Sequence, residues 1–145
     1  MTRDVYASFK TDKGLEETGI WLDYGPFRVR IARAGGANKR FARTLEAKTR
    51  PYQRAIKTET MDNAVAERIM RETFSTVVII DWETKNEAGE WEKTLQLPDG
   101  TMAPPTPENI SKVLEELSDL FIDIQEQAQK AANFRDAQRD ANAGN

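Results

Sequence analysis

The sequence predicts an α+β fold: a predominantly helical single domain with an N-terminal β-hairpin and a C-terminal amphipathic helix. Three observations support this prediction. The length of 145 residues fits one domain better than two large ones. Two β-prone runs flank a turn at Gly25 and Pro26, and apolar residues recur at helical spacing over much of the chain after Asn38.

We expect the domain to cover residues 20–131, between two polar flanks. Residues 1–19 carry only scattered apolar side chains, which favours a mostly irregular polar N-terminal arm. Residues 132–145 are small and polar, which predicts a disordered tail.

The hairpin is predicted within residues 20–33. Phe27, Val29 and Ile31 alternate with basic residues, so the second strand would have one apolar and one cationic face. The following Gly35 and Gly36 lack the other residues of a phosphate-binding loop, and we interpret them as a hinge.

A helix is expected to follow, with Asn38 as its N-cap and with Phe41 and Leu45 on one apolar stripe. Pro51 falls inside this pattern. Because proline cannot donate the helical hydrogen bond, it should kink or split the helix.

A second helix is predicted from near Thr60 to about Ser75. Residues 76–80 could be strand or helix, since strand-forming residues follow helical spacing without a Gly or Pro stop. Residues 81–105 are predicted as a polar connection with turns at residues 86–89 and 98–100, and this connection could form a small hairpin.

The C-terminal helix has the clearest boundary in the chain. Thr106 can cap it, Pro107 suits its first position, and Glu108 favours the positive end of the helix dipole. Apolar residues then recur at a period of about 3.6 residues as far as Ala131. Ser118 and Asp119 could cap a second helix midway.

The expected core follows from these periodicities. It comprises Trp21, Phe27, Val29, Ile31, Phe41, Leu45, Val65, Ile69, Phe74, Trp82, Ile110, Leu114, Leu117, Phe121 and Ile124.

The residue types exclude several kinds of chemistry. The chain has no Cys and no His, so thiolate metal sites, Cys nucleophiles and imidazole catalysis are all excluded. The acids of residues 108–123 lack the spacing of a calcium loop or of a helical di-metal site, and we interpret them as a solvated face. We therefore expect no enzyme, no cofactor and no metal.

Charge is distributed unevenly along the chain. Residues 1–58 hold 13 Lys and Arg against 6 Asp and Glu, whereas residues 59–145 hold 8 against 18. Most of the basic excess lies in residues 28–57. It could contact nucleic acid or an acidic partner, including a second copy of the chain. Because the aromatic residues of this segment lie on its apolar stripe, a solvated cationic back is the favoured interpretation.

The second half of the chain carries a series of short motifs. The first is an apolar run that ends in a tryptophan, at residues 77–82. The second is the start of an apolar helix at residues 106–109. Two further motifs follow, a mostly apolar stretch at residues 120–124 and the sequence Ala-Ala-Asn-Phe-Arg at residues 131–135. Over about residues 60–135 the sequence resembles the tail assembly chaperones of long-tailed, siphovirus-like bacteriophages.

The resemblance implies a non-enzymatic factor that works in the host cytoplasm and is absent from the mature virion. It would bind the tape measure protein, keep it soluble and help recruit tail tube subunits. The alternatives are a nucleic-acid-binding phage factor using basic residues 28–57, or a structural virion component. We expect no membrane partner, because no apolar run is long enough to span a bilayer. Opposite charges on the two halves would also allow self-association.

We place the partner contacts on the C-terminal helix, at Leu120, Phe121 and Ile124. An unbroken helix over residues 110–131 would extend about 33 Å, at about 1.5 Å per residue, and a core of this size should leave part of its stripe uncovered. The alternative is that the whole stripe packs on the chain's own helices.

Overall fold

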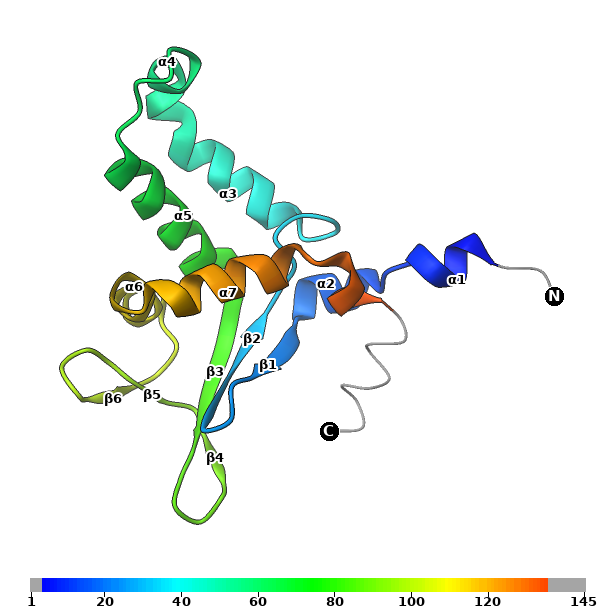
Figure 1. The fold of residues 1–145 in the computed structure, drawn as a ribbon, viewed down its shortest axis with the longest axis vertical. Coiled ribbons are helices and arrows are strands. Elements are labelled where there is room, and N and C mark those ends of the chain that lie inside the picture. The colour runs from blue at the N-terminus through cyan, green and yellow to red at the C-terminus, as the bar shows by residue number, and fades with distance from the viewer. Residues whose placement is uncertain (1–3, 136–145) are drawn as a thin grey trace.

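A four-stranded antiparallel sheet organises residues 4–135, the part of the chain that this computed structural model describes. Its strand order is β1-β2-β3-β4. A separate two-stranded hairpin, β5–β6, lies beside it (Figure 1). The strands are β1 (Ile20–Asp23), β2 (Phe27–Ile31), β3 (Ile79–Lys85), β4 (Trp91–Glu92), β5 (Leu95–Gln96) and β6 (Met102–Ala103). Together with the helices below, this architecture confirms the predicted α+β fold and its N-terminal hairpin.

The register separates an apolar face of the sheet from a charged one. Val29 lies opposite Trp82 on the apolar face. Arg28 lies opposite Glu83 on the other face, which we call the charged face. Because successive side chains of a strand point to opposite faces, the alternation predicted for β2 produces this separation.

The central strand β3 corrects the predicted polar connection over residues 81–105. Helix α5 ends at Val77 and β3 begins at Ile79, so residues 76–80 are divided between helix and strand. The sequence did not predict this strand because Asp81 and Glu83 are acidic residues typical of a loop. In the structure they lie opposite basic residues of β2 on the charged face. The small hairpin expected within this segment is present as β5–β6, and the structure places it around residues 98–100.

The C-terminal apolar segment forms two helices, α6 (Pro107–Glu116) and α7 (Ser118–Gln129), which run in different directions (Figure 1). The Thr106 side chain accepts a hydrogen bond from the Asn109 amide at 3.2 Å, as expected of an N-cap. The chain leaves helical geometry at Leu117, which has φ −105° and ψ 73°. An unbroken helix was therefore the wrong expectation. The division near Ser118 was correct, but Ser118 and Asp119 do not cap α7, because its N-cap is Leu117 and no side chain makes a cap hydrogen bond there.

A helical hairpin projects away from the sheet. It consists of α3 (Lys39–Thr49), the 3-10 turn η1 (Arg50–Tyr52), α4 (Gln53–Lys57) and α5 (Asn63–Val77). Pro51 lies in η1 and splits the helix, as predicted. Asn38 precedes α3 but its side chain makes no cap hydrogen bond. Its amide instead donates to the carbonyl oxygens of Arg33 and Val77.

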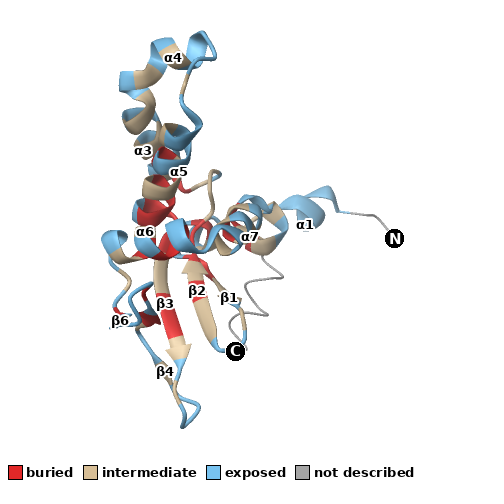
Figure 2. Cartoon of the chain, turned by 60° about the vertical axis from the view of Figure 1, so that its left-hand side comes forward, coloured by how far each residue is buried: buried red, intermediate tan, exposed pale blue. Residues whose placement is uncertain are grey.

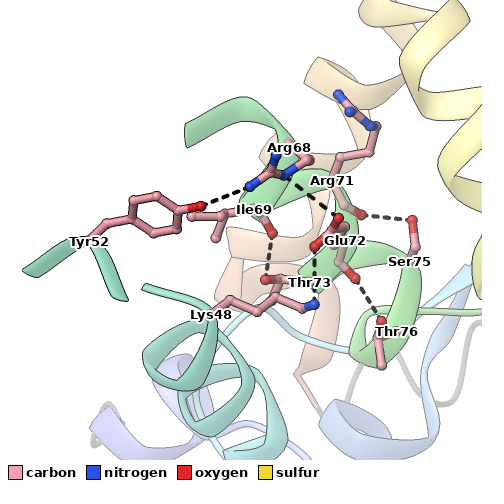
Figure 3. A network of polar contacts seen from close by, with 9 residues as sticks. All are labelled: Lys48, Tyr52, Arg68, Ile69, Arg71, Glu72, Thr73, Ser75 and Thr76. Atoms are coloured by element: carbon pink, nitrogen blue, oxygen red, sulfur yellow. Dashed lines mark hydrogen bonds and ion pairs between the residues drawn. The ribbon is translucent and has the colours of Figure 1, made fainter. Parts of the chain in front are cut away.

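We call residues 39–68 of this hairpin the arm, and we call the sheet with the remaining helices the body. No residue of α3, η1 or α4 is buried, and Figure 2 shows the outer part of the arm as mostly exposed. Polar contacts join α3 and η1 to α5 (Figure 3). Lys48 Nζ lies 3.1 Å from Glu72 Oε2, and Arg68 donates to the Tyr52 hydroxyl at 3.1 Å.

The N-terminal segment is more regular than expected. It contains two short helices, α1 (Val5–Phe9) and α2 (Lys13–Thr18). Asp4 and Asp12 cap them by accepting hydrogen bonds from the amides of Tyr6 and Leu15. The prediction of a mostly irregular arm is therefore wrong, and the missed signal is an aspartate before each helix.

Order also continues beyond the expected end of the domain at residue 131. A 3-10 turn, η2 (Ala131–Phe134), closes the described chain, and the Phe134 side chain is fully buried. Arg135 forms an isolated antiparallel bridge with Thr11. The rest of the predicted tail, residues 136–145, lies outside the described residues.

The core lies between the apolar face of the sheet, the inner ends of α5 and α6, and α7. The buried members of the predicted core are Val29, Ile31, Ile69, Phe74, Trp82, Ile110, Leu114 and Ile124. Those that are only partly buried are Trp21, Phe27, Phe41, Leu45, Val65 and Phe121. Leu117 was assigned to the core wrongly: it is 46% exposed because it lies in the break between α6 and α7.

Candidate functional site

An apolar groove lies where the β5–β6 hairpin faces the start of β2 and the junction of α6 and α7. Its volume is about 440 Å³. The lining residues are mostly apolar and come from four parts of the fold: Pro26, Phe27, Thr84, Leu95, Gln96, Leu97, Pro98, Met102, Val113, Glu116, Leu117 and Leu120.

The hairpin wall of the groove is fixed to the body through β3. The indole Nε1–H of Trp82 donates to the Ala103 carbonyl oxygen at 3.0 Å. The Thr84 hydroxyl donates to the Thr94 carbonyl oxygen at 2.6 Å. These bonds attach β6 and the residue just before β5 to the sheet, so the hairpin wall of the groove is held in place by the body.

The helix break supplies the opposite wall. Leu117 occupies the break, and Leu120 follows one turn later on α7. Met102 on the hairpin is 50% exposed, so it and Leu117 both present apolar surface beside the groove. Clustered exposed apolar residues of this kind mark binding surfaces more often than scattered ones do.

Four acidic side chains and one basic side chain lie beside this apolar surface. Two shallow depressions that share Leu97, Pro98, Leu117 and Leu120 with the groove are also lined by Asp99, Lys112, Glu115, Glu116 and Asp119. Within residues 4–135, no ion pair engages the three acids of α6 and α7 in this set. The groove therefore suits an apolar segment that also carries positive charge.

The structure separates the three predicted contact residues. Leu120 lines the groove. Phe121 packs edge-on against Phe74, with ring centroids 5.4 Å apart and an interplanar angle of 76°. Ile124 is 1% exposed and belongs to the core. Leu120 is therefore the member of the set that lines the groove. Leu120 and Phe121 are both partly buried and pack against the core, whereas Ile124 is buried within it.

Two further structural findings concern ligands and membranes. Across residues 4–135, no three or more His, Cys, Asp or Glu side chains are grouped so that they could hold a metal ion. The helices of the same region are all too short or too polar to span a bilayer.

Comparison with known proteins identifies the family. A family model described as the YdaY prophage protein matches residues 36–145. The chain belongs to this family. It is therefore a phage-derived protein. No curated protein and no solved structure matches the chain. The matched YdaY region contains the arm, the β5–β6 hairpin and the α6–α7 wall of the groove.

The YdaY region also contains most of the basic segment 28–57, which the fold divides among three places. Arg28 and Arg30 lie on the charged face of the sheet. Arg33 pairs with Glu16, with Nη1 and Oε1 2.7 Å apart. The remaining basic residues lie on the arm. Five of them are exposed and have no ion pair within the described region: Lys39, Arg40, Arg43, Arg54 and Lys57.

On the charged face of the sheet, the guanidinium of Arg28 contacts the rings of two tryptophans. Its guanidinium carbon lies 4.3 Å from the ring centroid of Trp21 and 4.2 Å from that of Trp91. The same guanidinium donates to the buried carboxylate of Glu83. Because Arg28 contacts both rings and pairs with Glu83, we assign this cluster a structural role.

The loop at Gly35 and Gly36, where the YdaY match begins, packs against the side chain of Glu16. The Glu16 carboxylate is buried and accepts hydrogen bonds from Arg33 and from the Ala37 amide. Gly36 has φ 54°, and a Cβ atom there would lie 2.6 Å from that carboxylate. The loop therefore holds the chain's own carboxylate, which favours a structural role over a phosphate site.

Proposed function

We propose that this prophage protein is a tail assembly chaperone that binds the tape measure protein, keeps it soluble and helps recruit tail tube subunits. The observation that carries the proposal is the apolar groove with the acidic side chains beside it. A groove of this kind takes the apolar face of an amphipathic helix. The resemblance over residues 60–135 supports the same role, because tape measure proteins are long and helical.

The proposal requires no catalytic residue, cofactor or metal. Its chemistry is burial of apolar surface on a client, at roughly 25 cal/mol per Å² of surface removed from water. The charged exterior of the chaperone would keep the complex in solution. The chaperone would act in the host cytoplasm and be absent from the mature virion.

Co-expression with the tape measure protein of the same prophage tests this proposal. Leu117→Ser and Leu120→Ser change the groove, whereas Ile122→Ser is a matched control on α7, since Ile122 is 53% exposed and does not line the groove. We expect the tape measure protein to stay soluble with the wild type and the control, and to precipitate with the groove variants. A client that stays equally soluble with both groove variants would contradict the proposal.

Mass spectrometry of purified virions separates a chaperone from a structural component. We expect the chain to be missing from the particle. Its presence in amounts comparable to a tail protein would instead support a structural role.

A second candidate, a nucleic-acid-binding phage factor, is favoured by the five exposed basic residues of the arm, which have no ion pair among residues 4–135. Cationic side chains on one projecting element supply sequence-independent affinity for phosphates, and such affinity falls steeply with salt. A salt titration with single-stranded and duplex probes, comparing the wild type with Lys39→Gln/Arg43→Gln, tests it. Micromolar binding that the double variant weakens would support this candidate over the chaperone.

A further inference from the structure

Two apolar features of the molecule are largely uncovered within residues 4–135, and the elements that form them lie on opposite sides of it (Figure 1). One is the apolar groove. The other is helix α1, whose Val5, Tyr6 and Phe9 are 67%, 79% and 71% exposed. These three side chains are spaced so that they gather on one side of the helix. Arg135 lies over the Phe9 ring, 5.4 Å from its centroid, and leaves most of the side chain exposed.

Helix α1 cannot fill the groove of its own chain. Only residues 10–12 connect it to α2, and three extended residues reach about 10 Å. This connection is also fixed: the Asp12 amide donates to the Phe134 carbonyl oxygen at 2.7 Å, and Thr11 bridges to Arg135. Helix α1 is therefore attached beside the end of η2, on the far side of the molecule from the groove.

We propose that the groove of one copy receives helix α1 of a second copy. Charge complementarity favours this occupant. The exposed cations Lys10 and Lys13 follow α1, while Glu116 and Asp119 lie at the groove. Tyr6 and Phe9 are aromatic anchors of the type that dominates protein interfaces, and the groove offers them a mostly apolar lining.

The contact joins two different surfaces, so it is heterologous. Each copy that inserts its own α1 still has an open groove, and each copy that receives a helix still has a free α1. Such a contact extends head to tail into an open assembly unless the rotation between copies closes a ring. The proposed client would occupy the same groove, so α1 and the client would compete for it in any one copy. Self-association is measured without a client, so this inference can fail while the proposed chaperone function stands, and the reverse also holds.

Sedimentation velocity of the full chain over a wide concentration range tests the inference. We expect the wild type to associate as concentration rises, and we expect Phe9→Ser and Leu117→Ser each to weaken association by at least about tenfold. Both residues are exposed, so thermal unfolding of the dilute variants should match that of the wild type. Ile122→Ser, an exposed apolar residue outside both surfaces, should associate like the wild type.

Mixing the two variants gives the decisive measurement. Phe9→Ser keeps an intact groove and Leu117→Ser keeps an intact α1, so a mixture contains one functional pair of surfaces. We expect the mixture to form a heterodimer and no larger species. A wild type that stays monomeric at every concentration, variants that associate like the wild type, or a mixture that forms no heterodimer would each overturn the proposal.

Discussion

The arm and the body of this molecule are stabilised in different ways. The body buries a continuous apolar cluster that joins the sheet to α5, α6 and α7. In the arm, α3, η1 and α4 contain no buried residue, and the buried part of α5 begins only at Ile69. The arm depends on a few contacts, including the edge-on packing of Phe41 against Phe74, with ring centroids 5.8 Å apart.

The difference has a thermodynamic and a functional side. Because apolar burial is the main favourable term in folding, the body should unfold as one cooperative unit, while the arm can open locally at lower cost. The surfaces differ in the same way. The body presents the apolar groove, and the arm presents positive charge that has no ion pair in the part of the chain that the structure describes.

The largest expected effect is on the body. Trp82→Ala empties a site that is 2% exposed and removes the hydrogen bond to Ala103, so we expect the free energy of unfolding to fall by ~3–5 kcal/mol. Urea unfolding followed by circular dichroism measures it. Trp91→Ala, at a partly exposed ring, is the control and should cost much less. Equal losses for the two variants would break the distinction between core and charged face.

Next in size is the ion pair that attaches α2 to the body. Glu16→Gln leaves the partly exposed Arg33 without its carboxylate, and we expect a loss of about 2–3 kcal/mol at neutral pH. Glu17→Gln changes an exposed neighbour and is the matched control. If the two variants are equally stable, Glu16 does not anchor α2.

The same variant gives a pH dependence of known sign. Burial raises the pKa of Glu16, but hydrogen bonds from Thr11, Ala37 and Arg33, together with the charge of Arg33, outweigh it and hold the pKa below its ordinary value. A lowered pKa stabilises the fold above the ordinary carboxyl value and loses that contribution as the pH falls through the lowered value. The deficit of Glu16→Gln should therefore shrink below about pH 4. A deficit that stays constant in acid would contradict this account.

A smaller and local effect is expected in the arm. Leu45→Ala removes a partly buried side chain of α3 and should cost about 1–2 kcal/mol, mostly as easier opening of the arm. Hydrogen exchange checks this, since amides of α3 and the start of α5 should exchange faster while those of β2 and β3 stay protected. Arg43→Ala, exposed on the same helix, is the control. Equal acceleration in the sheet would show that arm and body unfold together.

The smallest effect is expected at the ion pair between Lys48 and Glu72 (Figure 3). The side chains of Lys48 and Glu72 are 32% and 43% exposed, so Lys48→Gln should cost no more than ~1 kcal/mol. The cost should decline as salt is added. Lys39→Gln, at a cation without an ion pair in the described chain, should have no effect on unfolding. A salt-independent loss at Lys48 would indicate a packing role for its aliphatic stem.

Local signals predicted much of the fold. Thr106 and Pro107 marked the start of α6, and Pro51 marked the division after α3, because caps and proline act through atoms only a few residues away. The alternation in β2 predicted which of its side chains face the core. Each of these features can be inferred from a short window of sequence.

Features that depend on distant residues were missed. Asp81 and Glu83 looked like loop residues because their partners, Arg30 and Arg28, lie about fifty residues earlier in the chain. Glu16 and Phe134 are isolated in polar sequence, so no periodicity indicated that both would be buried.

The candidate site was only partly predictable for the same reason. Leu120 was predicted from the apolar stripe of its own helix, and it lines the groove. Phe27 and Met102 come from two other elements, and only the fold brings them together with Leu120. Leu117 belonged to the same stripe, but the helix break exposed it.

The positions of the tryptophans determine what an optical experiment can observe. All three, Trp21, Trp82 and Trp91, belong to the four-stranded sheet, and the arm contains none. Intrinsic fluorescence of this protein therefore monitors the sheet. An arm that has already melted would leave the emission spectrum nearly unchanged, and a single clean fluorescence transition would not establish that the whole chain unfolds in one step.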